Sequence, residues 1–176
     1  MSNRAVTRML VIVGAVLALV AAASPATAGT SSTSTSTSTA GPTICLPVRL
    51  TGTGNGLPDD GSGTIRTEAL ISFAGVPVAT TIAKFTPQPS PVGGPLSFIG
   101  PIVFTPRAGT STFTAQVQGT VDLDSGKFRA QSTSITGTGV LAGISGSLTF
   151  AGTQDLASGK FTESIRGSLC SRVRPW

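Results

Sequence analysis

The chain has 176 residues, of which 39% are apolar and 11% are charged, and its formal net charge is +5. This length fits one modest domain, and the composition excludes a coiled coil and a disordered polyelectrolyte. Because the sequence contains no His and no Tyr, it also excludes His-based catalytic triads, imidazole metal sites and Tyr general acids.

The first 28 residues have the pattern of a secretory signal peptide. Arg4 and Arg8 precede an apolar run over residues 9–23, and Ala26-Thr27-Ala28 places small residues where a signal peptidase cleaves. The run is shorter than the roughly 20 residues that cross a bilayer core. We therefore predict a signal peptide over 1–28, no transmembrane anchor after its cleavage, and a secreted or extracellular protein that is either released or associated with the cell surface.

Two further segments flank the body of the chain. Residues 29–42 are mostly Ser and Thr, which predicts a disordered stalk of the kind that carries O-linked glycans. Residues 172–176 form a short basic tail. Without Arg4 and Arg8, ten basic residues remain against seven acidic ones, a net charge of +3. So few charges predict no nucleic-acid partner.

The body, predicted as one domain over residues 43–171, alternates apolar and polar residues with a period of two. This alternation is typical of half-buried strands, and Pro and Gly clusters over residues 57–63 and 87–95 separate the strands. About eight strands result, and we predict an antiparallel β-barrel. A β-sandwich is the alternative, because both folds produce the same alternation. The clearest alternating segments cover residues 65–73, 96–104 and 111–123.

A ten-residue repeat sharpens the strand assignment. Residues 119–128 and 152–161 are identical at eight of ten positions, and each copy predicts a hairpin. Apolar residues change parity across each turn, which requires an even-numbered loop, and Ser-Gly dipeptides at 125–126 and 158–159 favour two-residue loops. In this register, Leu123 lies opposite Phe128 and Leu156 opposite Phe161 on the core face. Outside, Asp122 lies opposite Arg129.

The two cysteines, Cys45 and Cys170, lie near the two ends of the body. In an exported chain we expect them to form one disulfide. Both are out of phase with the apolar positions of their own strands, so we predict the bond on the non-core face. It would join the first strand to the last and close the sheet.

Glu163 is the only charged residue that the predicted register places on an apolar face, between Phe161 and Ile165. In that register Gln154 is its partner across the hairpin. Burial would raise the pKa of the carboxyl and suit it to act as an acid or to orient a ligand. The alternative is a hydrated pair at the barrel mouth. We therefore treat Glu163 as a candidate catalytic residue and Glu163 with Gln154 as candidate ligand-binding residues.

Other polar clusters indicate turns rather than sites. Asp122, Asp124 and Asp155 lack the remaining ligands of an EF-hand, and Asp59-Asp60-Gly61 reads as a turn. No serine lies in a nucleophile elbow with a base available, and the glycine-rich segment over residues 137–146 lacks the Lys and the helix of a phosphate loop. We predict no metal ion and no cofactor.

The stretch from Thr136 to Phe150, with its Gly-Thr-Gly and Gly-rich turn leading into a long strand, resembles the glycine-rich segment of the allene oxide cyclase and dirigent barrels. Secreted bacterial proteins of unknown role resemble the sequence more closely still. The resemblance implies a small antiparallel barrel with an apolar lumen. In cyclases that lumen holds an unstable lipid epoxide, and in dirigent proteins it steers the radical coupling of phenols. The chain departs from the families in lacking Tyr and in having Leu141 where an aromatic is common.

From these observations we expect a secreted or cell-surface, non-enzymatic barrel whose partner is a small apolar ligand or a cell-surface component. The alternative is a cyclase-like or dirigent-like enzyme or coupling director acting on an apolar substrate, with Glu163 as its polar anchor. A third possibility is an envelope protein whose barrel contacts glycans. The lumen discriminates between the first two. A cavity of a few hundred Å³ around Glu163 favours ligand chemistry, whereas an interior filled by Phe and Leu argues for a structural module.

Overall fold

The computed structural model describes residues 42–172 of the chain. The predicted signal peptide, all of the predicted stalk except Pro42, and all of the predicted tail except Arg172 lie outside these residues. Within them, no helix is long and apolar enough to span a membrane. The elements are β1 (Thr43–Gly56), β2 (Ile65–Phe73), β3 (Val76–Gln88), β4 (Leu96–Pro106), β5 (Phe113–Val121), β6 (Lys127–Gly137), the 3₁₀ turn η1 (Gly139–Leu141), β7 (Ser145–Gln154) and β8 (Lys160–Arg172).

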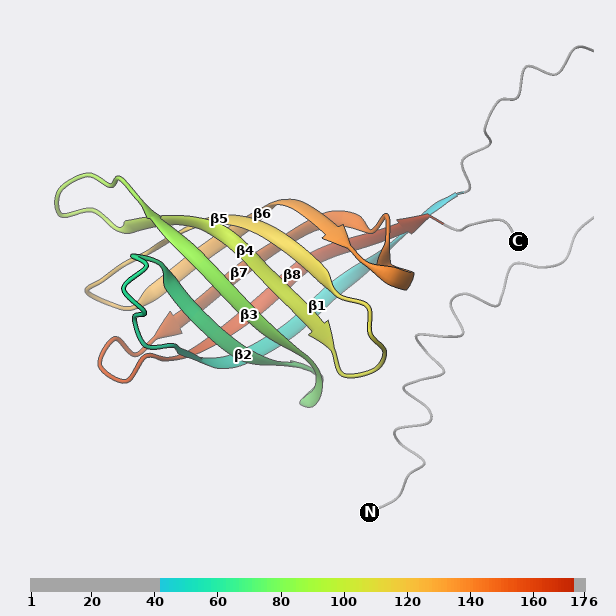
Figure 1. Cartoon of the computed structure of the whole chain (residues 1–176), viewed down its shortest axis with the longest axis horizontal. Coiled ribbons are helices and arrows are strands. Elements are labelled where there is room, and N and C mark those ends of the chain that lie inside the picture. The colour runs from blue at the N-terminus through green and yellow to red at the C-terminus, as the bar shows by residue number, and fades with distance from the viewer. Residues whose placement is uncertain (1–41, 173–176) are drawn as a thin grey trace, which may run out of the picture. The chain divides into compact units, whose positions relative to one another are not determined.

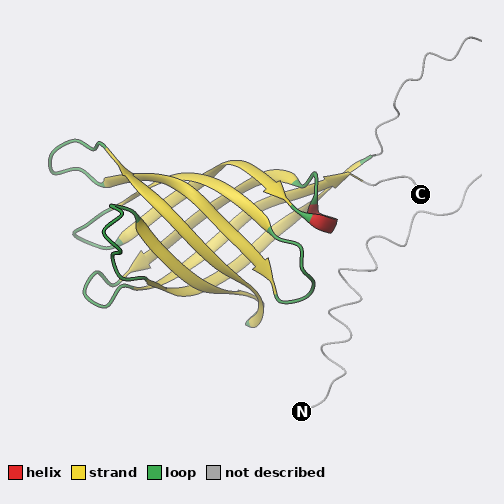
Figure 2. Cartoon of the chain, viewed as in Figure 1, coloured by secondary structure: helices red, strands yellow, loops and turns green. Residues whose placement is uncertain are grey.

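The eight strands form one closed antiparallel barrel, which Figures 1 and 2 show from the side. Each strand pairs with the next along the chain, and β1 pairs with β8 from Thr43 to Asn55 to close the sheet. Closure gives every strand a paired neighbour on both sides, which removes the two edge strands of an open sheet and their aggregation hazard. The predicted barrel is confirmed, and the alternative β-sandwich is wrong.

The barrel has two different ends. The first, which we call the mouth, carries the connections β1–β2, β3–β4, β5–β6 and β7–β8. The second, which we call the disulfide end, carries the other three connections, the start of β1 and the end of β8 (Figure 1). Large side chains fill the interior toward the disulfide end, where the Phe104 ring stacks on Phe113 with centroids 4.3 Å apart. The largest fully buried side chains are Phe104, Phe150, Ile71, Leu148 and Ile165.

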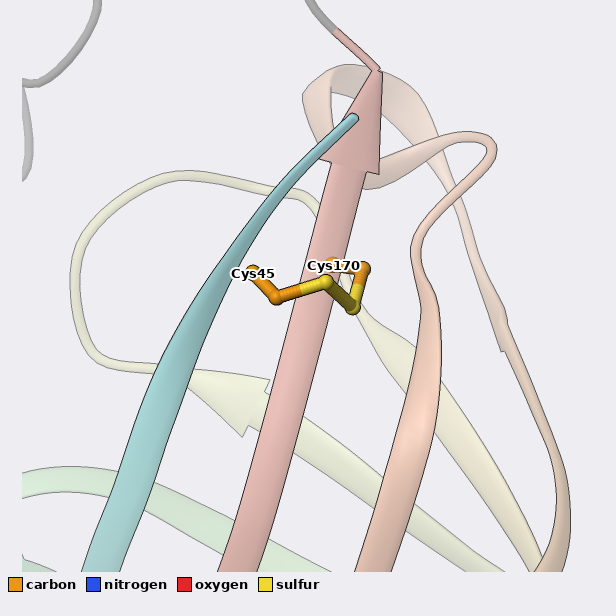
Figure 3. The surroundings of a disulfide bond; sticks show 2 residues. All are labelled: Cys45 and Cys170. Carbon is orange, nitrogen blue, oxygen red and sulfur yellow. A yellow bond between two sulfur atoms is a disulfide. The ribbon is translucent and has the colours of Figure 1, made fainter. Parts of the chain in front are cut away.

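One disulfide joins Cys45 on β1 to Cys170 on β8, as predicted (Figure 3). The two residues are directly opposite each other in the β1–β8 pairing, with their Cα atoms 3.9 Å apart. Cys45 is exposed, and both cysteines alternate with inward-facing neighbours such as Val48 and Ile165. The bond therefore lies on the outer face and covalently closes the barrel at the disulfide end.

The repeated segments form the β5–β6 and β7–β8 hairpins, but the predicted two-residue loops are wrong. Four residues separate Asp122 from Lys127, whose backbones are hydrogen bonded at 2.8 Å. The Asp122 carboxylate accepts backbone N–H bonds from Asp124 at 2.9 Å and from Ser125 at 3.0 Å. Asp155 makes the equivalent bonds in the second copy. Each hairpin therefore closes on an aspartate-capped turn.

The longer loops move the predicted cross-strand pairs by two positions. Val121, not Leu123, lies opposite Phe128, and Gln154, not Leu156, lies opposite Phe161. Leu123 and Leu156 lie in the loops, 55% and 48% exposed, because the turn begins before them. Asp122 caps the turn, so Arg129 pairs with Thr120 instead. A four-residue loop is also even-numbered, so the core and solvent faces stay as predicted.

The two copies of the repeat provide a matched test of the turn geometry. Gly126 and Gly159 both have positive φ, 67° and 72°, so Ala is strained at either position. A Cβ at Gly126 would also overlap the Gln154 carbonyl oxygen, whereas at Gly159 the nearest atom would be 3.7 Å away. We expect Gly126→Ala to lower the free energy of unfolding by about 1 kcal/mol or more beyond Gly159→Ala in urea denaturation. Equal losses would contradict the close packing of the β5–β6 turn on β7.

Candidate functional site

A cavity of about 80 Å³ lies inside the barrel on the side of the mouth. Strands β2 to β8 all contribute to its wall, which is mainly apolar. The predicted site residues Glu163 and Gln154 both line it. The wall consists of Ile65, Thr67, Thr81, Ala83, Phe85, Phe98, Ile102, Val121, Phe128, Ala130, Phe150, Gln154, Phe161 and Glu163.

Phenyl rings form most of the wall toward the mouth, in two pairs. Phe85 and Phe98 are tilted at a centroid distance of 4.8 Å, and Phe128 and Phe161 are edge-to-face at 6.1 Å. Both distances lie in the range where aromatic pairs attract. The four rings are buried or half-buried, and all of them line the cavity.

Two of the rings, those of Phe161 and Phe98, lie against the sheet because glycines stand opposite them on the neighbouring strands. Phe161 pairs with Gly54, and Phe98 pairs with Gly119. A Cβ at Gly54 would be 2.5 Å from the tip of the Phe161 ring, and a Cβ at Gly119 would be 2.7 Å from that of Phe98. Each ring therefore covers bare glycine backbone, which is a known way to stabilise glycine in strands.

Glu163 occupies a niche of the same kind. It pairs with Gly52 on β1 and with Gly152 on β7. A Cβ at Gly52 would be 2.6 Å from the Glu163 Oε1 and 2.7 Å from its Cγ, so the carboxyl side chain lies across the Gly52 backbone. The sequence pattern indicates Glu163 but gives no sign of Gly52, which makes room for it.

The carboxyl of Glu163 is in an environment that disfavours its charge. Burial raises the pKa of this carboxyl from its ordinary value of 4.5 to about 7. Glu163 is the only ionisable residue in the cavity wall. Among residues 42–172, no side chain forms an ion pair with it; the ion pair in this region joins Asp60 and Arg66 at 3.0 Å.

Contrary to the prediction, Gln154 is not directly opposite Glu163 but lies nearer the mouth. The structure places Gly152, not Gln154, opposite Glu163, because the hairpin loop is two residues longer than predicted. The Gln154 side-chain amide donates a hydrogen bond to the Gly159 carbonyl oxygen at 3.3 Å. Gln154 thus lies at the rim of the cavity, one inward-facing position from Glu163.

A wider groove continues from this rim to the surface. It measures about 610 Å³ and lies between the β1–β2 connection and the β7–β8 hairpin. Ile65 and Gln154 line both the groove and the cavity, so the two spaces adjoin. Asp59 and Arg66 are the charged residues of the groove wall. The mouth therefore offers a narrow inner space and a broader, more polar outer one.

The aspartates at the mouth accept hydrogen bonds from backbone N–H groups within the turns. Hydrogen bonds from Ser62, with Arg66 adding a smaller effect, lower the pKa of Asp60 to about 2. Backbone N–H donors of Ser125 and Asp124 lower the pKa of Asp122. Within the described part of the chain, no group of three or more His, Cys, Asp or Glu side chains is placed to hold a metal ion.

No family model matches the chain, and no curated protein matches it by sequence. Two solved structures are similar to it in fold. One is the pterocarpan synthase dirigent protein GePTS1, at a TM-score of 0.55 and 8% identity over 81% of this chain and 99% of that one. The other is the pterocarpan synthase dirigent protein PsPTS1, at 0.50 and 8% over 74% and 96%. At such identities the likeness shows the fold alone: the chain has a dirigent-like barrel.

Proposed function

We propose that the protein is a secreted or cell-surface barrel that binds a small, mainly apolar ligand at its mouth without transforming it. The observation that carries this proposal is the phenylalanine-walled cavity with one carboxyl, Glu163, set into its side. Ligand sites in proteins are typically apolar concavities with a few placed polar groups. Here those groups are Thr67, Thr81, Gln154 and Glu163. The Cys45–Cys170 disulfide supports export, because such bonds persist in oxidising compartments.

The dimensions limit how the ligand is held. Small-molecule sites commonly measure roughly 300–1,000 Å³. The inner cavity at Glu163 measures about 80 Å³, which is smaller than the few hundred Å³ expected from the sequence for a ligand site within the lumen alone. The inner cavity therefore receives one end of the ligand, and the adjoining groove of about 610 Å³ receives the rest.

A second candidate is a dirigent-like or cyclase-like enzyme or coupling director. The likeness to two pterocarpan synthase dirigent proteins favours it, and a carboxyl with a pKa of about 7 is suited to proton transfer near neutral pH. Against it, Glu163 is the only ionisable group in the cavity wall, and acid–base catalysis commonly uses a second group to complete the reaction. We therefore place ligand binding first.

The proposal is tested by mass spectrometry of lipophilic extracts from the full chain purified out of the medium of secreting cells. Ala83→Met adds a flexible side chain to the cavity wall, and Ala151→Met makes the same change on the exposed face of β7. We expect a small molecule to co-purify with the natural chain and with Ala151→Met, and to be lost from Ala83→Met. Recovery of nothing from the natural chain would contradict binding, and conversion of the recovered molecule on incubation would favour the enzyme.

A further inference from the structure

The Glu163 carboxyl has no cationic partner supplied by the barrel. The flanking strands present glycines, Gly52 on β1 and Gly152 on β7. Across the lumen, β2 and β3 contribute Thr67 and Thr81 to the wall, and β4 to β6 contribute only apolar residues. Within the described residues, no Lys or Arg lines the cavity.

The basic residues next to the cavity in sequence lie outside it. Lys84 and Arg129 alternate with lining residues and are exposed on the outer face of the barrel, and the others lie near acidic groups at the mouth. Arg66 forms its ion pair with Asp60. Lys127 and Lys160 are exposed and lie near the turn aspartates Asp122 and Asp155, whose pKa values they help to lower. The cavity thus holds one potential negative charge for which residues 42–172 supply no counter-ion.

A cation that entered this cavity would meet two favourable features together. An opposite charge within about 4–6 Å of a carboxyl favours its ionised form and offsets the cost of burying it. Phenyl rings attract cations through the negative charge of their faces, by about 0.5–2 kcal/mol. The rings of Phe85, Phe98, Phe128 and Phe161 surround the same space. A neutral ligand would gain only the apolar contact, and an anion would be repelled. Where the carboxyl is not ionised, the cost of burying an unpaired ammonium ion offsets the attraction of the rings.

We propose that the ligand is an organic ammonium ion, whose charged head lies beside Glu163 among the phenyl rings and whose apolar chain extends through the rim into the groove. This inference rests on the proposed ligand-binding function. The 80 Å³ of the inner cavity holds roughly two or three water-sized groups. That space suits a primary alkylammonium head rather than a bulky quaternary one, and the groove beyond Gln154 accommodates the chain.

The test uses three probes with the same eight-carbon chain and different charges: octylammonium, 1-octanol and octanoate. Binding to the full chain is measured by titration calorimetry at pH 8.0 and pH 5.5. At pH 8.0 we expect octylammonium to bind about tenfold tighter than octanol, and octanoate more weakly than octanol. At pH 5.5, where the Glu163 carboxyl is protonated, the preference for octylammonium should disappear while octanol binding is unchanged. Binding of octylammonium near pH 6.5 should release a proton, visible as a dependence of the heat on the buffer.

Three substitutions locate the effect. Glu163→Gln should lower octylammonium binding at pH 8.0 about tenfold, to the level of octanol binding measured on the same variant. Gly52→Ala keeps the carboxyl but displaces it, since the new Cβ would be 2.6 Å from Oε1, so it should also abolish the preference. Glu68→Gln makes the same chemical change on the exposed face of β2 and should have no effect.

The outcomes separate the two proposals. Equal binding of octanol and octylammonium at pH 8.0 would overturn the ammonium ligand and leave the apolar-ligand function standing. An ammonium preference that persists in Glu163→Gln would place the recognition elsewhere and overturn the inference. Binding of none of the three probes, together with an empty lipophilic extract, would overturn both.

Discussion

The double substitution Cys45→Ser/Cys170→Ser is expected to lower the free energy of unfolding by about 4–5 kcal/mol. The bond closes a loop between residues 125 positions apart, so its removal restores a large conformational freedom to the unfolded chain. The folded barrel should persist, because β1 and β8 remain paired from Thr43 to Asn55. Urea denaturation measures the loss, and the urea dependence should become steeper as the unfolded state expands.

Two controls accompany this measurement. The natural chain under a reducing agent should unfold at the same urea concentration as the double variant, and so should Cys45→Ser alone. Far-ultraviolet circular dichroism without urea should be the same for all of them. A loss below about 1 kcal/mol would mean that the unfolded chain keeps its ends together without the bond, contrary to the entropic origin assumed here.

The closed barrel could be predicted from the sequence because its two signals are robust. Alternation in segments such as 65–73 and 111–123 depends only on which face is buried, and strands β2 and β5 occupy these segments. The phase of Cys45 and Cys170 against their apolar neighbours placed both on one face of adjacent strands. The alternation and the phase of the cysteines together favour a closed sheet. Alternation alone fits a barrel and a sandwich equally well.

The hairpin register could not be predicted in the same way. Two-residue and four-residue loops are both even-numbered, so the alternation in the 119–128 repeat agrees with either. What decides between them is the Asp122 carboxylate, which satisfies two backbone N–H groups of the longer turn. That local hydrogen bonding outweighs the burial of Leu123, which is left 55% exposed.

The niche of Glu163 depends on which residues of β1 and β8 lie opposite each other. These strands are far apart in the sequence, and the alternation of apolar and polar residues does not specify their register. The disulfide does specify it. With Cys45 directly opposite Cys170, counting seven residues along each strand places Gly52 opposite Glu163, and nine residues place Gly54 opposite Phe161. A directly opposed cysteine pair, had it been assumed, would therefore have predicted both glycine contacts.

Glu163→Gln is expected to leave stability almost unchanged at pH 4.5 and to raise the free energy of unfolding by about 3 kcal/mol at pH 8. The carboxyl has a pKa of about 7 in the barrel, against 4.5 ordinarily, because burial disfavours its charge. Between these values the folded state holds a proton that the unfolded state has lost. The stability of the natural chain therefore falls as pH rises from about 4.5 to 7, and Gln removes this fall because it does not ionise.

The comparison is specific because the chain has one other glutamate, Glu68, and its side chain is exposed. Glu68→Gln, on the outer face of β2, should leave the pH dependence between 4.5 and 8 as it is in the natural chain. Asp60, Asp122 and Asp155 have lowered pKa values, so the stability they contribute is lost only as pH falls below about 3.8, outside this range. A constant difference between Glu163→Gln and the natural chain from pH 4.5 to 8 would mean that Gln alters packing alone. The carboxyl would then be hydrated at the mouth, as the alternative held, and the cavity would have no buried charge to offer a ligand.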